Sequence, residues 1–106
     1  MSAKEIFENI KANLEAQPDK LAGLNASYQF DLSGEGGGTF FINVADGKIE
    51  VGEGAAESPG CTVSMSASDF ADMVEGRLNP TAAFMSGKLK IKGDMGLAMK
   101  LQALLG

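Results

Sequence analysis

The segment from Met95 to Leu105 restricts the possible folds of this chain more than any other segment. Asp94 precedes it as an N-cap, and the helix predicted from there has only two polar side chains, Lys100 and Gln102. Because its apolar residues cover nearly the whole circumference, this helix has no separate inside and outside faces. It therefore needs apolar surroundings on more than one side. A partner protein, a membrane, the core of the domain or a bound apolar ligand would supply them.

The length and composition favour one small domain spanning residues 1–106. A net charge of −5 argues against nucleic acid as a partner, because neutralising phosphates requires a basic surface. No apolar run approaches the roughly 20 residues of a membrane span. Charges interrupt the apolar pattern of the first residues, which argues against a secretory signal. The single cysteine, Cys61, excludes an internal disulfide and fits a reducing compartment.

Charge is distributed unevenly along the chain. Residues 1–76 hold thirteen acidic residues against four lysines, whereas residues 77–106 hold five basic residues against one acid. Three of the basic residues, Lys88, Lys90 and Lys92, fall on one face of a predicted strand. They either protect an exposed sheet edge from pairing or, with Lys100, form a patch that attracts an anionic headgroup or membrane.

The first half of the chain predicts a helix followed by a meander. Ser2 and Glu5 form a capping box, and Pro18 ends the helix. Strands are predicted at residues 27–32, 39–44 and 48–51, with a glycine turn between the first two and an Asp-Gly hairpin between the last two. The apolar residues expected to face the core are Ile6, Phe7, Ile10, Leu14, Tyr28, Phe30, Leu32, Phe40, Ile42 and Val44. Phe41 falls on the opposite face.

The second half of the chain predicts one more strand of the sheet, then helices around a last strand. Cys61, Val63 and Met65 mark the fourth strand. Ser66 and Asp69 cap a helix that ends near Gly76, and Asn79-Pro80 starts another short helix. The fifth strand, residues 89–92, turns Leu89 and Ile91 inward.

Most catalytic chemistry is excluded by the residue types that are absent. Without histidine, the chain has no Ser-His-Asp triad, Cys-His pair or histidine metal site. Cys61 is expected to be a small buried apolar residue on its strand. The glycine run at residues 34–38 precedes a strand, whereas a phosphate-binding loop precedes a helix. We therefore expect no catalytic residues, no metal site and no cofactor.

Methionines gather in the same half of the chain as the apolar helix. Methionine fills irregular cores and also adapts to ligands of varied shape, so an internal apolar cavity is an alternative to a filled core. The methionines of this half are Met65, Met73, Met85, Met95 and Met99, and they lie beside Phe70 and Phe84.

The run from residue 66 to residue 105 resembles the C-terminal signature of the sterol carrier protein-2 (SCP-2) family of lipid-binding domains. The matching segments are SDF at 68–70, EGRLNP at 75–80 and AFMSGKLKIKGDMGLAMKLQ at 83–102. The first half is similar more loosely, through the order of helix and meander and the segment GTFFINVADGK.

The resemblance implies an α+β fold with a five-stranded, mostly antiparallel sheet in the order 3-2-1-4-5, covered by helices. It also implies a hydrophobic tunnel closed by the C-terminal helix. Such a tunnel binds fatty acids, fatty acyl-CoA, sterols and phospholipids without catalysis. By matching position, the tunnel wall includes Phe40, Phe84, Met85, Met95, Gly96, Leu97 and Met99. The apolar pattern adds Phe70, Met73, Leu101 and Leu104 as neighbours.

The sequence departs from the family pattern at its C-terminal end. It ends Leu104-Leu105-Gly106 where eukaryotic members carry a peroxisomal tripeptide, so a cytoplasmic location is expected. Because relatives continue past the last helix, the tunnel mouth here is expected to be open or the helix free to meet a second subunit. We expect a monomer or weak homodimer with transient membrane contact. The alternative hypothesis is a protein-interaction or dimerisation module that uses the apolar helix and holds no lipid.

Overall fold

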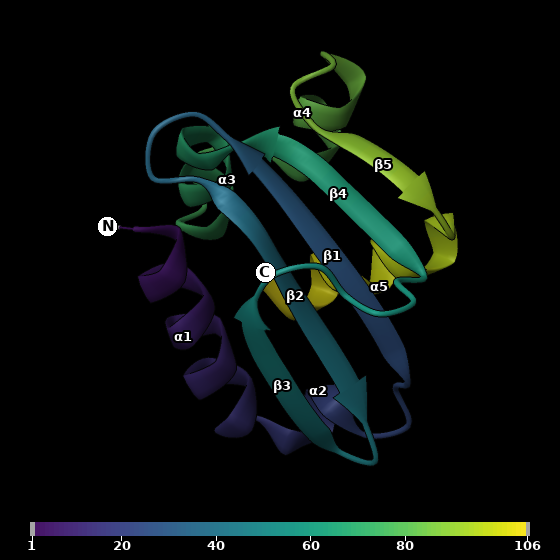
Figure 1. Cartoon of the computed structure of the whole chain (residues 1–106). Helices are drawn as coiled ribbons and strands as arrows, with labels where there is room; N and C mark the ends of the chain where they lie inside the picture. Colours follow the sequence, from purple (N-terminus) through teal and green to yellow (C-terminus); the bar gives the residue numbers. More distant parts are fainter. Residues whose placement is uncertain (1, 106) are drawn as a thin grey trace.

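Five helices and five strands are formed by residues 2–105, the part of the chain that the computed structural model describes (Figure 1). The helices are α1 (Ala3–Glu15), α2 (Pro18–Leu21), α3 (Ala67–Val74), α4 (Pro80–Met85) and α5 (Met95–Leu105). The strands are β1 (Ala26–Ser33), β2 (Gly38–Ala45), β3 (Lys48–Glu53), β4 (Cys61–Ser66) and β5 (Lys90–Gly93).

Side-chain caps start the helices where the sequence predicts them. Ser2 and Glu5 form the expected capping box of α1, and the Ser66 hydroxyl accepts from the Asp69 N–H at the start of α3. Asn79 Oδ1 accepts from two backbone N–H groups of α4, and Asp94 Oδ1 does the same for α5. These bonds satisfy donors that the first helical turn leaves without partners. The predicted helix starts are confirmed.

The strands form one sheet in the order β3-β2-β1-β4-β5. Neighbours are antiparallel except β1 and β4, which run parallel and are connected through β2, β3 and the loop at residues 54–60. The β2–β3 connection is the predicted two-residue hairpin turn, with φ of 53° at Asp46 and 75° at Gly47. The glycine run closes the β1–β2 hairpin as predicted. The predicted fold class is confirmed.

One face of the sheet carries the core. Alternate residues of the three central strands are buried there, and the helices cover this face, with α1 against β3 and α5 against β4 and β5. In Figure 1, α5 lies behind the sheet. The buried residues of these strands are Tyr28, Phe30, Leu32, Phe40, Ile42, Val44, Cys61, Val63 and Met65. Cys61 is fully buried, as predicted.

The opposite face of the sheet is partly covered by the loop at residues 54–60, which crosses in front of it in Figure 1. The Ala56 N–H donates to Gln29 Oε1 at 3.1 Å, and the Gly60 N–H donates to the Ser27 carbonyl at 2.9 Å. On the same face, the Phe41 ring lies over Gly52, its partner on β3, which accounts for an aromatic residue on the outward side. No helix within residues 2–105 is both long and apolar enough to cross a membrane.

Four phenylalanine rings fill the core beneath β1 and β2. The Phe7 ring lies 5.1 Å from the Phe30 ring, 4.7 Å from the Phe40 ring and 5.2 Å from the Phe70 ring, centroid to centroid. Phe7 therefore connects α1 and α3 to the sheet. Aromatic pairs at these distances add about 0.5–1.5 kcal/mol each beyond the area that they bury.

We predict that Phe7→Ala lowers the free energy of unfolding by about 3–5 kcal/mol, because it removes a buried ring at the centre of this cluster. Urea denaturation measures the change. Phe41→Ala is the matched control, since Phe41 is half-buried on the opposite face, and its loss should be clearly smaller. Equal losses for the two variants would show that the aromatic cluster has no special weight.

Candidate functional site

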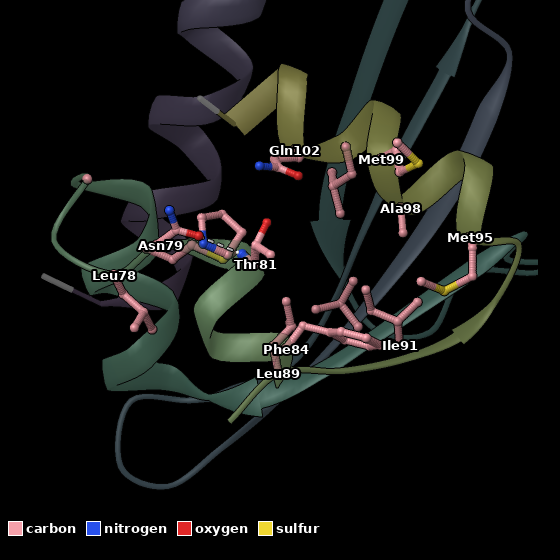
Figure 2. A pocket seen from close by; sticks show the side chains of 15 residues that line it. Leu78, Asn79, Thr81, Phe84, Leu89, Ile91, Met95, Ala98, Met99 and Gln102 are labelled. Carbon is pink, nitrogen blue, oxygen red and sulfur yellow. Dashed lines mark hydrogen bonds between the residues drawn. The ribbon is translucent and has the colours of Figure 1, made fainter. Parts of the chain in front are cut away.

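A pocket of about 490 Å³ lies between the α3–α4 turn, α4, β5 and α5 (Figure 2). Its size is within the roughly 300–1,000 Å³ typical of small-molecule sites. It is lined by Val63, Met73, Gly76, Leu78, Asn79, Pro80, Thr81, Phe84, Leu89, Ile91, Met95, Ala98, Met99, Leu101 and Gln102.

The α5 wall of the pocket is fixed at its N-terminal end by a buried tyrosine. The Tyr28 hydroxyl on β1 donates to the Leu97 carbonyl at 2.8 Å. Asp94 Oδ1 accepts from the Gly96 N–H at 2.7 Å, and a Cβ at Gly96 would lie 3.0 Å from that oxygen. The small residue at position 96 therefore leaves room for the cap.

Close approach of the loop before β4 also holds α5 in place. The Asp94 N–H donates to the Gly60 carbonyl at 2.9 Å. A Cβ at position 60 would lie 2.5 Å from Leu97 Cδ1, so this position requires glycine unless the leucine moves. Leu97 thus packs against the loop, on the side of α5 away from the pocket lining.

The opposite wall is positioned by the turn between α3 and α4. The Asp72 carbonyl accepts from the N–H groups of Arg77 and Leu78, which carries Leu78 to the pocket. The Arg77 guanidinium forms ion pairs with Asp72, at 3.0 Å, and with Glu75. The hydrogen bond from Arg77 to Asp72 is the main reason why the pKa of Arg77 is raised, and the nearby Glu75 raises it further.

The pocket lining is mostly apolar, and none of the described lining residues is charged. Its polar side chains, Asn79, Thr81 and Gln102, gather at one end in Figure 2, whereas Phe84, Ile91 and Met95 lie toward the other. Within residues 2–105, no three carboxylate or thiol side chains lie close enough together to hold a metal ion. This arrangement suits an apolar chain with a polar end.

The structure brings some of the sequence-predicted residues together and separates others. Those that line the pocket are Met73, Phe84, Met95, Met99 and Leu101. Phe40 and Phe70 belong to the aromatic cluster, and Met85 is 80% exposed outside the pocket lining. Gly96 and Leu97 face the cap and the loop, as described above. Ligand contact by these residues stays a prediction.

Ten lining residues were not among the sequence-predicted set. For Leu89 and Ile91 the sequence gives an indication, because their alternation with lysines predicts that their side chains point inward from the fifth strand. The Asn79-Pro80 pattern predicts a helix start, and such a pattern does not show what these two residues contact elsewhere in the fold. Only the tertiary structure places that start opposite α5.

Lys90 and Lys92 extend from β5 on the side opposite Leu89 and Ile91, and both are exposed, as is Lys88 just before the strand. Since β5 is the edge strand of the sheet, the three lysines lie along an edge, in keeping with either role predicted for them. A second pocket of about 320 Å³ is lined by Lys20, Ala22, Gly23, Leu24, Lys100 and Leu104.

Comparison with known families identifies the fold. Residues 7–106 match the family model described as the SCP-2 sterol transfer family. The chain belongs to this SCP-2 family. The resemblance found in the sequence is thereby confirmed, and lipid binding is the general function that the family and the apolar pocket support.

Relatives of this SCP-2 chain include longer proteins. Hydroxysteroid dehydrogenase-like protein 2 of Xenopus tropicalis is 54% identical over 104 residues, which are 97% of this chain but 24% of that protein. Human sterol carrier protein 2 is 39% identical over 106 residues, 96% of this chain and 19% of that protein. The chain therefore spans about a quarter or less of these relatives, and the dehydrogenase-like name describes the longer proteins.

Solved SCP-2 structures share the fold. The solution structure of palmitated SCP2L2 from Aedes aegypti has a TM-score of 0.81 and 26% identity, covering 99% of this chain and 95% of that one. The sterol carrier protein domain 2 of Helicoverpa armigera has a TM-score of 0.75 and 36% identity, covering 94% and 84%.

The anchor of α5 in this SCP-2 chain contains two buried titratable groups. Burial, with smaller contributions from Cys61 and Asp94, raises the pKa of Tyr28 to about 12. Burial, and then the Asp94 carboxylate, also raises the pKa of the Cys61 thiol. Both groups are therefore neutral at physiological pH, and the tyrosine keeps the proton that it donates to Leu97.

We predict that the free energy of unfolding falls by about 2–3 kcal/mol as the pH rises from about 10 to about 12. In that window the unfolded Tyr28 has lost its proton while the folded one retains it, so the unfolded state binds fewer protons. Denaturation curves at each pH measure the change. Because Tyr28 is the only tyrosine, tyrosinate absorbance of the folded protein gives its pKa directly.

Tyr28→Phe is the control for this pH dependence. It removes the ionising group and should abolish this part of the pH slope, leaving the contribution of Cys61, whose pKa is also raised in the folded state. A folded-state tyrosinate midpoint near pH 10 would contradict the buried anchor.

Proposed function

We propose that this chain binds one lipid molecule in the pocket between α4, β5 and α5 and transfers it to or from membranes. The apolar 490 Å³ pocket with an uncharged lining is the observation that carries this proposal. Fatty acids, fatty acyl-CoA, sterols and phospholipids are the candidate ligands, each with its apolar part inside.

Burial of the apolar chain supplies the affinity. Each buried methylene contributes roughly 0.8 kcal/mol, from which the cost of association is subtracted. Affinity should therefore grow with chain length until the pocket is full. Methionines on α5 adapt their side chains to chains of different shape, which favours a broad range of lipids.

In this proposal α5 acts as the cover of the site. Three lining residues are unusually exposed for large apolar side chains: Phe84 is 42%, Met95 48% and Met99 72% exposed. Their exposure places apolar surface at the edge of the pocket, where a lipid entering from a bilayer would meet it first. The helix is apolar nearly all round because one side packs on the sheet and another faces the ligand.

Similarity to solved proteins supports the proposed ligand class. The Aedes aegypti structure is described as palmitated, and other relatives are named sterol carrier proteins. By analogy with them, we propose that the ligand of this protein is an acyl lipid or a sterol. The pocket has the size and the apolar lining for such a ligand.

The proposed contact with membranes rests on the three lysines on or beside β5. Lys88, Lys90 and Lys92 are exposed on or beside the edge strand β5, which supplies Ile91 to the pocket, and Leu89 just before it lines the pocket too. Near an anionic surface each lysine contributes about 1 kcal/mol of attraction, which falls off within a Debye length. The lysines would hold the pocket close to the bilayer during exchange.

We predict that Ala98→Phe weakens binding of a long-chain lipid at least about tenfold, because the ring would occupy pocket volume beside Met95 and Leu101. Native mass spectrometry with saturated lipids of increasing length measures binding. Ala12→Phe is the matched control, since Ala12 is exposed on α1 and lines neither pocket, and it should bind as wild type does.

The alternative, a dimerisation module built on α5, is favoured by the exposure of Met85 and Met99, 80% and 72%. It predicts a dimer that survives complete delipidation and a protein that takes up no lipid of any length. That outcome in analytical ultracentrifugation and mass spectrometry would replace the lipid-binding proposal. A lipid affinity that does not change with chain length would also contradict the lipid-binding proposal.

We predict that replacing Lys88, Lys90 and Lys92 together by glutamine slows lipid transfer to anionic vesicles about tenfold and removes most of its salt dependence. Fluorescent lipid transfer assays measure the rate. The control replaces Lys4, Lys11 and Lys48, which changes the net charge equally but leaves β5 intact. Equal slowing by both triple variants would show that net charge, and not the β5 edge, governs transfer.

A further inference from the structure

We infer that the pocket holds one acyl chain of up to about sixteen carbon atoms, and that its buried floor, formed by Val63, Leu89 and Leu101, sets this limit. The inference rests on the proposed function and adds the class of lipid and the residues that select it. What carries it is a pocket of limited volume whose inner lining residues are buried, whereas its outer ones are exposed.

The volume of the pocket matches a single chain. A methylene group is about as large as a water molecule, which takes about 30 Å³ in the liquid, so 490 Å³ holds roughly sixteen methylene groups. A sterol, with roughly 27 carbon atoms, exceeds that volume, and a diacyl lipid places only one of its two chains inside. Since the polar lining residues Asn79, Thr81 and Gln102 are exposed, a head group beside them stays in water, and selection acts on the chain.

Three lining residues form the floor of the pocket, because their side chains have almost no access to solvent. Val63 is 2%, Leu89 6% and Leu101 5% exposed. They belong to β4, to the segment just before β5 and to α5. Buried side chains are close-packed against their neighbours, so they do not move aside for a larger ligand without strain elsewhere in the core. The floor is therefore the fixed boundary of the pocket.

The outer lining residues, Phe84, Met95 and Met99, do not set the limit. They are largely exposed, and methionine side chains are flexible. They can turn toward a bound chain or away from it. A chain too long for the floor continues past these residues into water, where further methylenes gain no burial.

Backbone contacts hold the floor in place. The Leu89 N–H donates to the Ala83 carbonyl at 3.1 Å, and Ala83 is itself fully buried on α4. Val63 is the partner of Ile91 in the antiparallel β4–β5 pair. Across the pocket, Ala98 projects from α5 toward Ile91 in Figure 2. The space for a chain thus depends on a leucine on one wall and an alanine on the other.

The test measures binding of saturated fatty acids of roughly 8 to 22 carbons, each affinity divided by that lipid's partition into phosphatidylcholine vesicles. Each methylene gains alike in the pocket and in the bilayer, so this ratio stays level until the pocket is full. Beyond about sixteen carbons we expect it to fall about fourfold per added methylene, because only the bilayer still buries the addition. Cholesterol should have a ratio at least about tenfold below that of hexadecanoate.

Three results would decide against the inference or the proposed function. A ratio that stays level through the longest chain, or that falls from the shortest one onward, would overturn the inference and leave lipid binding intact. Equal ratios for cholesterol and hexadecanoate would do the same. Failure of every lipid to bind would overturn the proposed function as well.

Two substitutions should move the break, the chain length at which the ratio begins to fall, in opposite directions. Leu89→Ala removes about three methylene-sized groups from the floor and should raise the break by about three carbons. Ala98→Leu adds about three and should lower it by as many. Because Ala98 is only partly buried, this second variant still tests the inference if Leu89→Ala does not fold.

The matched controls are Leu32→Ala and Ala12→Leu. Leu32 is buried on β1 and Ala12 is exposed on α1, and neither lines either pocket. Both variants should keep the break of the wild type. A break that neither lining substitution moves, or that a control moves as far, would show that the floor does not set the limit.

Discussion

The hydrogen bond from Tyr28 to the Leu97 carbonyl is the constraint on which the pocket depends. It joins the central strand β1 to the first turns of α5, with an oxygen–oxygen distance of 2.8 Å and a hydroxyl that has no access to water. Asp94 caps the same end of the helix and Gly60 lets the loop approach it. Because these contacts hold one side of α5, its other side is left to face β5 and α4 across a gap.

Two kinds of packing follow from this arrangement. Under β1 and β2, the ring cluster around Phe7 fills the core with rigid side chains at fixed distances. Around the pocket, methionine, leucine and isoleucine side chains take their place, and several are exposed. The rigid half stabilises the fold without a ligand, and the adaptable half can change shape around one. If the pocket is the binding site proposed above, stability and binding depend on different residues.

Local signals in the sequence predicted the elements well, because caps, turns and alternation act over a few residues. Ser2, Asn79 and Asp94 start helices where expected, and the sheet order agrees with the order that the family resemblance implied. The site was harder to predict. Phe40 and Phe70 have the same apolar character as pocket residues, and only the position of α1 shows that the Phe7 ring stacks on both of them. Gln102 stands out in the sequence as one of two polar residues on an apolar helix, but nothing in the sequence shows that Asn79 and Thr81 line the same pocket.

In the proposed function, the distribution of charge separates two tasks of a lipid carrier. Attraction to a membrane acts over a Debye length, so its charges work best outside the pocket, where Lys90 and Lys92 stand on an edge strand. Selection of a ligand acts at contact distance, inside a lining without charge. A cation within the pocket would attract anionic headgroups but would need its own counter-charge whenever the pocket was empty. Keeping the lysines on one side of β5 and the apolar residues on the other avoids that conflict, because alternation along a single strand supplies both surfaces.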